Sequence, residues 1–252
     1  MRAKFPRALN RSRSAKLNCG ILASMEAGSR LVQTASEGCY EAARAAALSG
    51  VPISTVYYWA RTGVVVPSVS PVREKLWSYA DLMALRIVSW LRHPKESDDA
   101  PLPASPMPQV RRALAEVERR GLQLWAPDAA TPSPLLVDRR GRVHLRIESQ
   151  ITDLRGQLVL AEDLLDLLAP FVVAGGNGPN LIAPRERLRI VPARVAGEPH
   201  VAGSRLTTLT LAALATRGMS HHEIAGLYQI DVEAVDQAVD LERQLNADSV
   251  AA

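Results

Sequence analysis

Cysteine, aromatic residues and long apolar runs are all scarce in this 252-residue sequence. Its two cysteines, Cys19 and Cys39, stand twenty residues apart with no histidine near either. A structural zinc site needs four closely spaced ligands, so we interpret the pair as reduced thiols. No apolar run approaches the roughly 18 residues of a membrane span, and residues 20–27 are too short for a convincing signal peptide. We therefore expect a cytoplasmic protein with no membrane partner.

Motifs for catalysis and for metal or cofactor binding are also missing. The run His221-His222-Glu223 lacks the H-E-x-x-H spacing that places two imidazoles on one helix face. The glycine run at 175–178 has no predicted strand before it and no Lys-Ser or Lys-Thr after it, so it is not a phosphate loop. Spacing suggests neither a Ser/His/Asp set nor a cleft with paired carboxylates. We predict no catalytic, metal-binding or cofactor-binding residue, and a protein that is not an enzyme.

Positive charge is concentrated at the N-terminus. Residues 1–30 contain seven basic residues and one acidic residue, whereas the net charge of the whole chain is +4, so the remainder is slightly acidic. Residues 1–39 show no periodicity, and we predict a disordered basic tail. Two interpretations stay open: solvated padding, which we favour, or a segment that strengthens nucleic-acid binding non-specifically.

Periodicity, capping residues and chain breakers predict a mainly α fold with short β-hairpins. The N-terminal part is expected to be a winged helix-turn-helix and the C-terminal part a trihelical unit of helix-turn-helix type. Predicted helices cover residues 41–48, 52–62, 79–91, 110–121, 158–168, 205–217, 220–227 and 231–245. A β-hairpin is predicted over 135–147 around Arg140-Gly141, with short strands near 187–191 and 200–201. Predicted N-caps are Ser54 or a neighbour, Ser78, Ser220 (in a capping box with Glu223) and Asp231.

These elements divide the chain into five segments. They are a basic tail (1–39), a winged domain (40–125), a hairpin, helix and linker (126–180), a C-terminal domain (181–246) and a short tail (247–252).

The stretch VPISTVYYWARTGVVVP (51–67) places three aromatic residues consecutively. Consecutive helical residues point about 100° apart, so Tyr57, Tyr58 and Trp59 cannot all enter one core. Ile53, Val56 and Trp59 follow one another at spacings of three and therefore share a buried side. The two tyrosines are left to flank the exposed side. In a helix-turn-helix the second helix enters the major groove, where aromatic hydroxyls and arginine suit phosphate oxygens and base edges.

Local charge and neighbouring side chains support nucleic-acid binding by this unit. Residues 40–95 hold seven basic and three acidic residues, a net of +4, and phosphate binding requires such an excess. Tyr57 and Arg61 are expected to form an (i, i+4) pair. The predicted DNA-binding residues are Ser54, Thr55, Tyr57, Tyr58, Arg61, Arg73 and Lys75.

Residues 40–92 resemble the MerR-type winged helix-turn-helix. The resemblance rests on Ala47-Leu48-Ser49-Gly50-Val51, on the aromatic pair followed by Arg61-Thr62-Gly63, on the hydrophobic-Pro wing start, and on Lys75-Leu76-Trp77-Ser78 before Tyr79-Ala80-Asp81-Leu82. It implies that Tyr58 and Arg61 touch the DNA backbone, that Trp59 is core, and that Lys75 replaces a wing Arg. The family often has Arg where Tyr57 stands, and no long dimerisation helix follows here.

The C-terminal unit has the wrong charge for a second DNA reader. Residues 190–245 hold four basic and seven acidic residues, a net of −3. The helix after Asp231 carries Glu233, Asp236, Asp240 and Glu242 against only Arg243. Carboxylates along one helix repel phosphates, so we expect a protein partner, and a basic one. The predicted partner-binding residues are Arg205, Glu233, Asp236 and Asp240.

This unit also resembles the domain-of-unknown-function family numbered 433. The matching features are Gly197-x-Pro199-x-Val201-x-Gly203-Ser204-Arg205, Gly218-x-Ser220, Glu223-Ile224, Tyr228 and Glu233-x-Val235. That family includes VapB-type antitoxins encoded beside PIN-domain ribonuclease toxins. The resemblance implies an antitoxin of a VapBC-type toxin–antitoxin system that neutralises such a ribonuclease and represses its own operon by binding operator DNA.

Other interpretations stay open. One is a MerR-like transcriptional regulator that senses a small ligand, although the C-terminal half has few aromatic residues to line a pocket. Others are a C-terminal unit that only dimerises, and a structural adaptor whose basic surface is accidental. Because dimers read two half-sites, we expect a homo-oligomer.

Overall fold

The computed structural model of the chain describes residues 37–95, 101–122, 124, 133–159, 164–166 and 178–250. Within these residues the fold is mainly helical with short antiparallel strand pairs, which confirms the predicted fold class. The predicted disordered tail lies outside the described residues up to residue 36. Among the described helices, none is both long and apolar enough to cross a membrane.

A helix-turn-helix forms from α2 (Ala42–Ser49) and α3 (Ile53–Arg61). Gly50 ends α2 with a φ of 71°, the left-handed conformation that favours glycine after a helix. The N-cap of α3 is Pro52, whose carbonyl accepts the N–H groups of Thr55 and Val56. The cap therefore falls two residues before Ser54, because the proline ring pre-sets the φ angle at which the helix begins.

The segment 62–77 between α3 and α4 (Tyr79–Arg92) is called the wing, and it ends in one strand of a two-stranded sheet. β1 (Tyr40–Glu41) pairs antiparallel with β2 (Leu76–Trp77), and Ser70 exchanges two backbone hydrogen bonds with Leu76, which closes the wing loop. The predicted cap at Ser78 is confirmed, and it forms a complete capping box with Asp81. α4 is a central helix of the core, with fully buried positions at Leu82, Leu85, Ile87, Val88 and Leu91.

The middle of the chain forms α5 (Met107–Arg119) and a four-stranded antiparallel sheet. The strand order is β5 (Gln150–Thr152), β4 (Val143–Ile147), β3 (Leu135–Asp138), β6 (Leu164–Asp166), and the β3–β4 hairpin turns where predicted. α5 begins three residues before the predicted start, with a proline in its first turn.

The predicted helix over residues 158–168 is wrong in its described parts. Leu158 forms a β-bridge with Thr152, and residues 164–166 are the strand β6, which pairs antiparallel with β3. A short leucine-rich run does not distinguish a helix from a buried strand by periodicity. The edge of β3 decides the outcome, because its buried backbone groups need hydrogen-bond partners and residues 164–166 supply them as a strand.

The C-terminal module begins with β7 (Leu188–Arg189) and β8 (His200–Val201), joined through the 3-10 turn η1 (Val195–Gly197). α6 (Thr208–Thr216), α7 (His221–Tyr228) and α8 (Val232–Val250) follow, and the predicted capping box of Ser220 and Glu223 is confirmed. Two boundaries differ from prediction. Thr207 caps α6, so this helix starts three residues late, and α8 continues through residues 247–250, which the sequence assigned to a tail.

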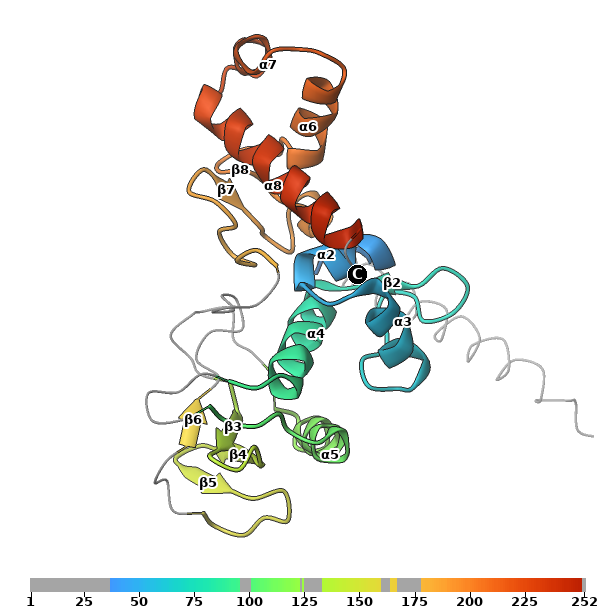
Figure 1. The fold of residues 1–252 in the computed structure, drawn as a ribbon, viewed down its shortest axis with the longest axis vertical. Helices are drawn as coiled ribbons and strands as arrows, with labels where there is room; N and C mark the ends of the chain where they lie inside the picture. The colour runs from blue at the N-terminus through green and yellow to red at the C-terminus, as the bar shows by residue number, and fades with distance from the viewer. Residues whose placement is uncertain are drawn as a thin grey trace, which may run out of the picture.

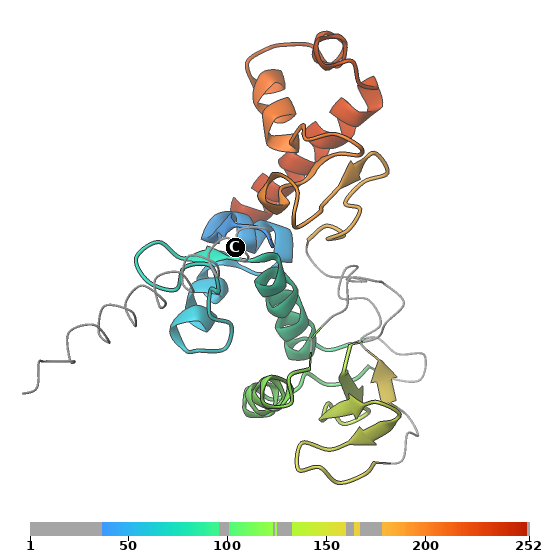
Figure 2. The same cartoon turned by 180° about the vertical axis from the view of Figure 1, so that it is seen from behind.

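The C-terminal module packs directly against the helix-turn-helix. The C-terminal part of α8 lies on α2, and the four-stranded sheet lies at the opposite end of the molecule from α6 and α7 (Figures 1 and 2). The hydroxyl of Tyr79 donates to the carbonyl of Leu181 at 2.8 Å, and Gly178 lies against the backbone of Gly50. The end of the predicted linker is therefore anchored on the N-terminal module.

Candidate nucleic-acid interface and inter-module junction

Two tyrosines and an arginine form the exposed side of α3. Tyr57 and Tyr58 are 45% and 50% exposed, whereas Trp59 is buried, as predicted. The guanidinium carbon of Arg61 lies 5.9 Å from the centroid of the Tyr58 ring. The Tyr57 ring meets Trp77 edge-on, with 6.3 Å between the centroids. Arg61 thus pairs with Tyr58 rather than with Tyr57 as expected, because the wing strand holds Tyr57.

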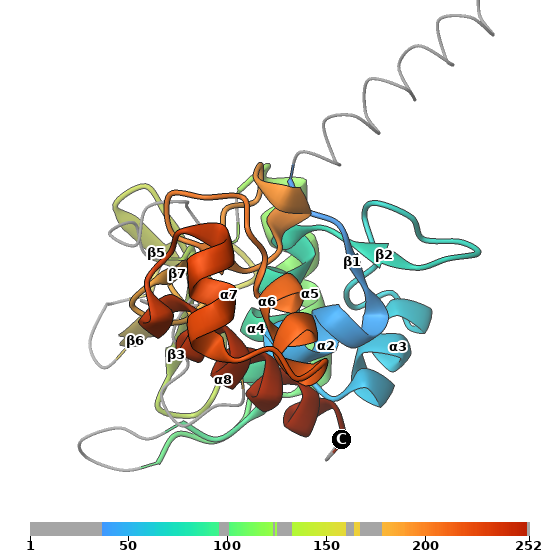
Figure 3. The ribbon, with the colours of Figure 1, turned by 90° about the horizontal axis from the view of Figure 1, so that it is seen from above.

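The other predicted DNA-binding residues lie on α3 and the wing. Ser54 is exposed and Thr55 half-buried at the start of α3, while Arg73 is exposed and Lys75 half-buried in the wing. The wing and α3 lie side by side at one side of the molecule (Figure 3), and Trp77 at the base of the wing touches Tyr57. The structure therefore brings the predicted residues of the two elements to one side.

Less positive charge reaches this surface than the sequence count implies. Arg86 is buried and donates to the carbonyls of Leu48 and Ser49, and burial lowers its pKa to about 10. Lys95 is buried 4.6 Å from the Trp90 ring centroid, and burial lowers its pKa to about 8. A sequence count cannot separate such structural cations from exposed ones.

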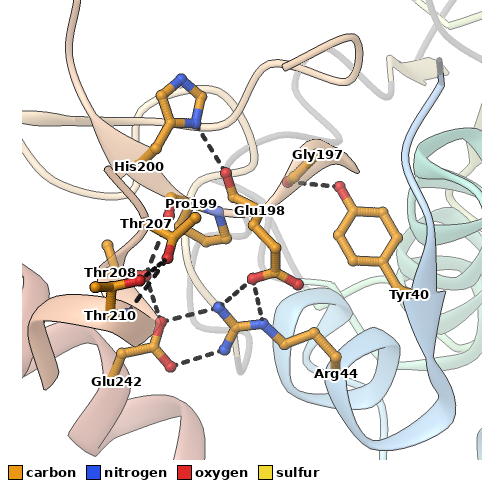
Figure 4. A network of polar contacts seen from close by, with 10 residues as sticks. All are labelled: Tyr40, Arg44, Gly197, Glu198, Pro199, His200, Thr207, Thr208, Thr210 and Glu242. Atoms are coloured by element: carbon orange, nitrogen blue, oxygen red, sulfur yellow. Dashed lines mark hydrogen bonds and ion pairs between the residues drawn. The ribbon is translucent and has the colours of Figure 1, made fainter. Parts of the chain in front are cut away.

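A third cation, Arg44, joins α2 to the C-terminal module (Figure 4). Its guanidinium pairs with Glu198 at 2.7 Å and with Glu242 of α8 at 2.8 Å. The side chain of Glu242 is only 3% exposed, and the Thr208 hydroxyl donates to the same carboxylate. Burial alone would lower the pKa of Arg44, but its hydrogen bond with Glu242 and the charge of Glu198 raise it overall. Removing one partner of such an enclosed ion pair strongly destabilises the folded protein, because the other charge stays buried without compensation.

Tyr40 and Gly197 form the second part of the junction (Figure 4). The Tyr40 hydroxyl donates to the Gly197 carbonyl at 2.7 Å, and the N–H of Cys39 donates to the Ala196 carbonyl at 2.9 Å. Gly197 has a φ of 82°, and a Cβ there would lie 2.0 Å from the Tyr40 hydroxyl oxygen. Residues 37–39, assigned to the disordered tail from sequence, therefore contact both modules: Cys39 bonds Ala196, and the Glu37 carbonyl accepts the N–H of Tyr79 at 2.9 Å.

Sequence reasoning did not identify the junction as a unit. Glu242 was grouped with the exposed carboxylates of its helix, but the structure places it inside the junction with Arg44. The only available signal was the Gly197-x-Pro199 motif, because a glycine with positive φ at a close contact tolerates no side chain.

The predicted partner-binding carboxylates lie on the exposed side of α8. Glu233, Asp236 and Asp240 have side-chain exposures of 56%, 57% and 59%. Each lies near an intramolecular cation or histidine: Glu233 is 3.6 Å from Arg187, Asp240 is 2.9 Å from Arg185, and Asp236 bonds His221. Arg205 is exposed in the loop between β8 and α6, so it comes from a different element.

Comparison with known proteins assigns a family to part of the chain. Residues 189–240 match DUF433, a family described as a protein of unknown function. The C-terminal module carries a DUF433 domain. The match runs from β7 into α8 and includes Gly197 and Glu198, whereas Glu242 lies two residues beyond it.

The chain was also compared with curated proteins and with solved structures. No curated protein matches the sequence. A crystal structure of Rv2018 from Mycobacterium tuberculosis is similar at a TM-score of 0.45 and 15% identity, over 80% of this chain and 96% of that chain.

Proposed function

We propose that the protein is a DNA-binding antitoxin of VapB type, with a MerR-like winged helix-turn-helix and a DUF433 module that holds a PIN-domain ribonuclease. The observation that carries the proposal is the exposed Tyr57, Tyr58 and Arg61 side of α3, the second helix of a helix-turn-helix. Adjacent exposed aromatic side chains are typical of a binding surface, and here Trp77 contacts Tyr57 and Arg61 contacts Tyr58. Preorganised side chains lose less entropy on binding.

The DNA contacts follow from the chemistry of these groups. The tyrosine hydroxyls and the Arg61 guanidinium donate hydrogen bonds to phosphate oxygens, which positions α3 in the major groove. Ser54 and Thr55, in the first turn of α3, lie where the N-terminal residues of a recognition helix reach base edges. Arg73 and Lys75 extend the contact along the backbone through the wing. A homodimer would present two such helices to two half-sites.

The acidic side of α8 supports a basic protein partner. Glu233, Asp236 and Asp240 present three carboxylates along one helix, on the module that matches DUF433. Arginines of a partner would have to displace Arg185 and Arg187 from these carboxylates. Exposed ion pairs of this kind contribute little stability, so the exchange costs little.

DNA binding is tested with the double variant Tyr58→Ala/Arg61→Ala against duplexes from the region upstream of the protein's own coding sequence. We expect at least a tenfold loss of affinity and a shallower dependence on salt, because phosphate contacts release counterions. Arg119→Ala/Arg155→Ala, which removes two exposed arginines away from α3, is the control and should leave affinity unchanged. Unchanged affinity and salt dependence in the double variant would contradict DNA binding by α3.

Partner binding is tested by co-expression with the protein encoded in the adjacent reading frame. We expect a ribonuclease with a PIN-type acidic metal site to co-purify, and its growth arrest to be relieved. Glu233→Gln/Asp236→Asn/Asp240→Asn should weaken the complex while operator binding is kept. Operator binding without any co-purifying partner or rescue would instead support the ligand-sensing regulator.

A further inference from the structure

A second basic surface begins where the exposed side of α3 ends. The Nη1 atom of Arg111, in α5, donates to the carbonyl of Thr62 at 2.9 Å, directly after α3. This bond places a guanidinium at the C-terminal end of α3, next to the position of Arg61. The buried side of α5 is formed by Val110, Ala113 and Val117, which leaves Arg111 and the following Arg112 exposed.

The β3–β4 turn is fixed on the same end of α5. The N–H of Val143 donates to the Gln109 side-chain oxygen at 3.3 Å. Gly141 has a φ of 72°, and a Cβ there would lie 2.7 Å from the Pro103 carbonyl, so the turn sits tightly on the segment before α5. Gln109 and Arg112 are three residues apart and share a helix face. The turn that carries the exposed Arg140 and Arg142 is thereby attached to the end of α5 that also carries Arg112.

Within the described part of the chain, acidic side chains leave most of this charge uncompensated. Asp138 pairs with Arg142 at 2.7 Å, and Glu116 pairs with Arg119 and Arg120, both at 2.6 Å, at the far end of α5. The hydrogen bonds from Arg119 and Arg120 lower the pKa of Glu116 to about 2. The excess positive charge therefore lies at the end of α5 that faces α3. We call the exposed set the arginine track: Arg61, Arg111, Arg112, Arg140 and Arg142.

We infer that the arginine track binds the phosphate backbone of duplex DNA flanking the segment read by α3. The inference rests on the proposed DNA binding and extends its footprint across α5 and the four-stranded sheet. Guanidinium groups bind phosphates in a fork geometry that suits this partner. Among the described residues, the exposed aromatic rings are Tyr57, Tyr58 and Tyr228, so beyond Arg61 the track offers no ring on which unpaired bases would stack. Arg44, Arg86 and Lys95 are enclosed in the fold and add no exposed charge to the α3 surface, whereas the arginines of the track do.

The test compares two lengths of one duplex. The wild-type protein selects its sequence from a random duplex library, and binding is then measured on the selected core alone and on the core with about one helical turn of flanking DNA. The wild type should bind the longer duplex about tenfold more tightly. Arg112→Ala/Arg140→Ala should lose that gain. For the longer duplex, the slope of log affinity against log salt concentration should also be smaller in magnitude by about 2, because two phosphate contacts are lost.

The control variant removes the same charge elsewhere. Arg119→Ala/Arg155→Ala changes two exposed arginines outside the track and should keep the length dependence. Equal binding of the longer duplex by the wild type and by Arg112→Ala/Arg140→Ala would overturn the inference, while binding of the core that depends on Tyr58 and Arg61 would leave the proposed function standing. Failure of the wild type to select any duplex would reject DNA binding itself, and with it the track as a DNA surface.

Discussion

At the scale of single residues, Gly197 is the clearest case of a contact that forbids a side chain. Its carbonyl accepts the Tyr40 hydroxyl, and its φ of 82° lies in the left-handed region. Gly203 in the same DUF433 motif has a similar φ of 77° but has no atom within 4 Å of its hypothetical Cβ. A side chain at Gly203 would therefore cause backbone strain alone, whereas a side chain at Gly197 would cause both strain and a steric clash.

We predict that Gly203→Ala costs about 1–2 kcal/mol, the strain of a left-handed residue. Gly197→Ala should cost about 2 kcal/mol more, because its Cβ also collides with Tyr40. Urea denaturation of both variants measures the difference in their free energies of unfolding. Adding Tyr40→Phe to Gly197→Ala should recover part of the lost stability. Equal losses of stability in Gly197→Ala and Gly203→Ala would mean that Tyr40 is not packed against Gly197.

Lys95 makes stability depend on pH with a defined sign. Burial lowers its pKa to about 8 from the ordinary 10.5. Between these values the unfolded chain binds more protons than the folded one, so the free energy of unfolding rises with pH. We expect the Tm of the wild type relative to Lys95→Met to increase between about pH 7.5 and about pH 10. A constant difference across this range would show that the ammonium is not desolvated.

At the scale of elements, two helices begin with the same kind of capping box in different surroundings. The Asp81 carboxylate accepts from the N–H of Ser78 and also from the N–H and hydroxyl of Ser68, each at 2.8 Å, so it ties the wing to α4. Glu223 makes the corresponding bonds to Ser220 at an exposed helix start. The box of α4 is therefore also a tertiary contact.

We predict that Asp81→Ala lowers the free energy of unfolding by about 2–3 kcal/mol, because it leaves the buried Ser78 N–H unpaired and releases Ser68 of the wing from α4. Glu223→Ala should cause a clearly smaller loss, since water replaces the lost acceptor. Hydrogen exchange should in addition show faster exchange of the Ser68 amide in Asp81→Ala only. Similar stability losses in the two variants would contradict the bridging role of Asp81.

At the scale of the whole molecule, the junction around Arg44 couples two modules that the chain separates by more than a hundred residues. Arg44 belongs to α2, Glu198 to the loop before β8, and Glu242 to α8. The same α8 carries the proposed partner surface, and α2 precedes the proposed recognition helix. Their relative position therefore depends in part on one enclosed guanidinium, together with the Tyr40–Gly197 contact.

We predict that Arg44→Ala destabilises the protein by about 3 kcal/mol, because it leaves the Glu242 carboxylate buried without a cation. Calorimetry should show one unfolding transition in the wild type and two in Arg44→Ala, one for each module. Arg44→Ala/Glu242→Ala should lose less than the sum of its single variants. Arg119→Ala, which breaks an exposed pair, is the control, and an equally small effect of Arg44→Ala would show that the junction is not a coupling element.

Local patterns in the sequence determined much of the architecture, because they act over a few residues. Gly50 and Pro52 set the helix-turn-helix, Ser78 and Ser220 start their helices, and Arg140-Gly141 turns the hairpin. The spacing of Val56 and Trp59 already assigned the buried side of α3 and left Tyr57 and Tyr58 exposed. The DNA-binding role of that exposed side stays a prediction.

Tertiary structure decided what depends on partners distant in sequence. The run at 164–166 became a strand because β3 offered an edge, and Glu242 left the acidic surface because Arg44 reached it from α2. Arg86 and Lys95 became structural cations because carbonyls and a ring enclosed them. Charge and periodicity identify residue types, but burial and pairing across the fold assign their roles, and these depend on contacts that no local pattern contains.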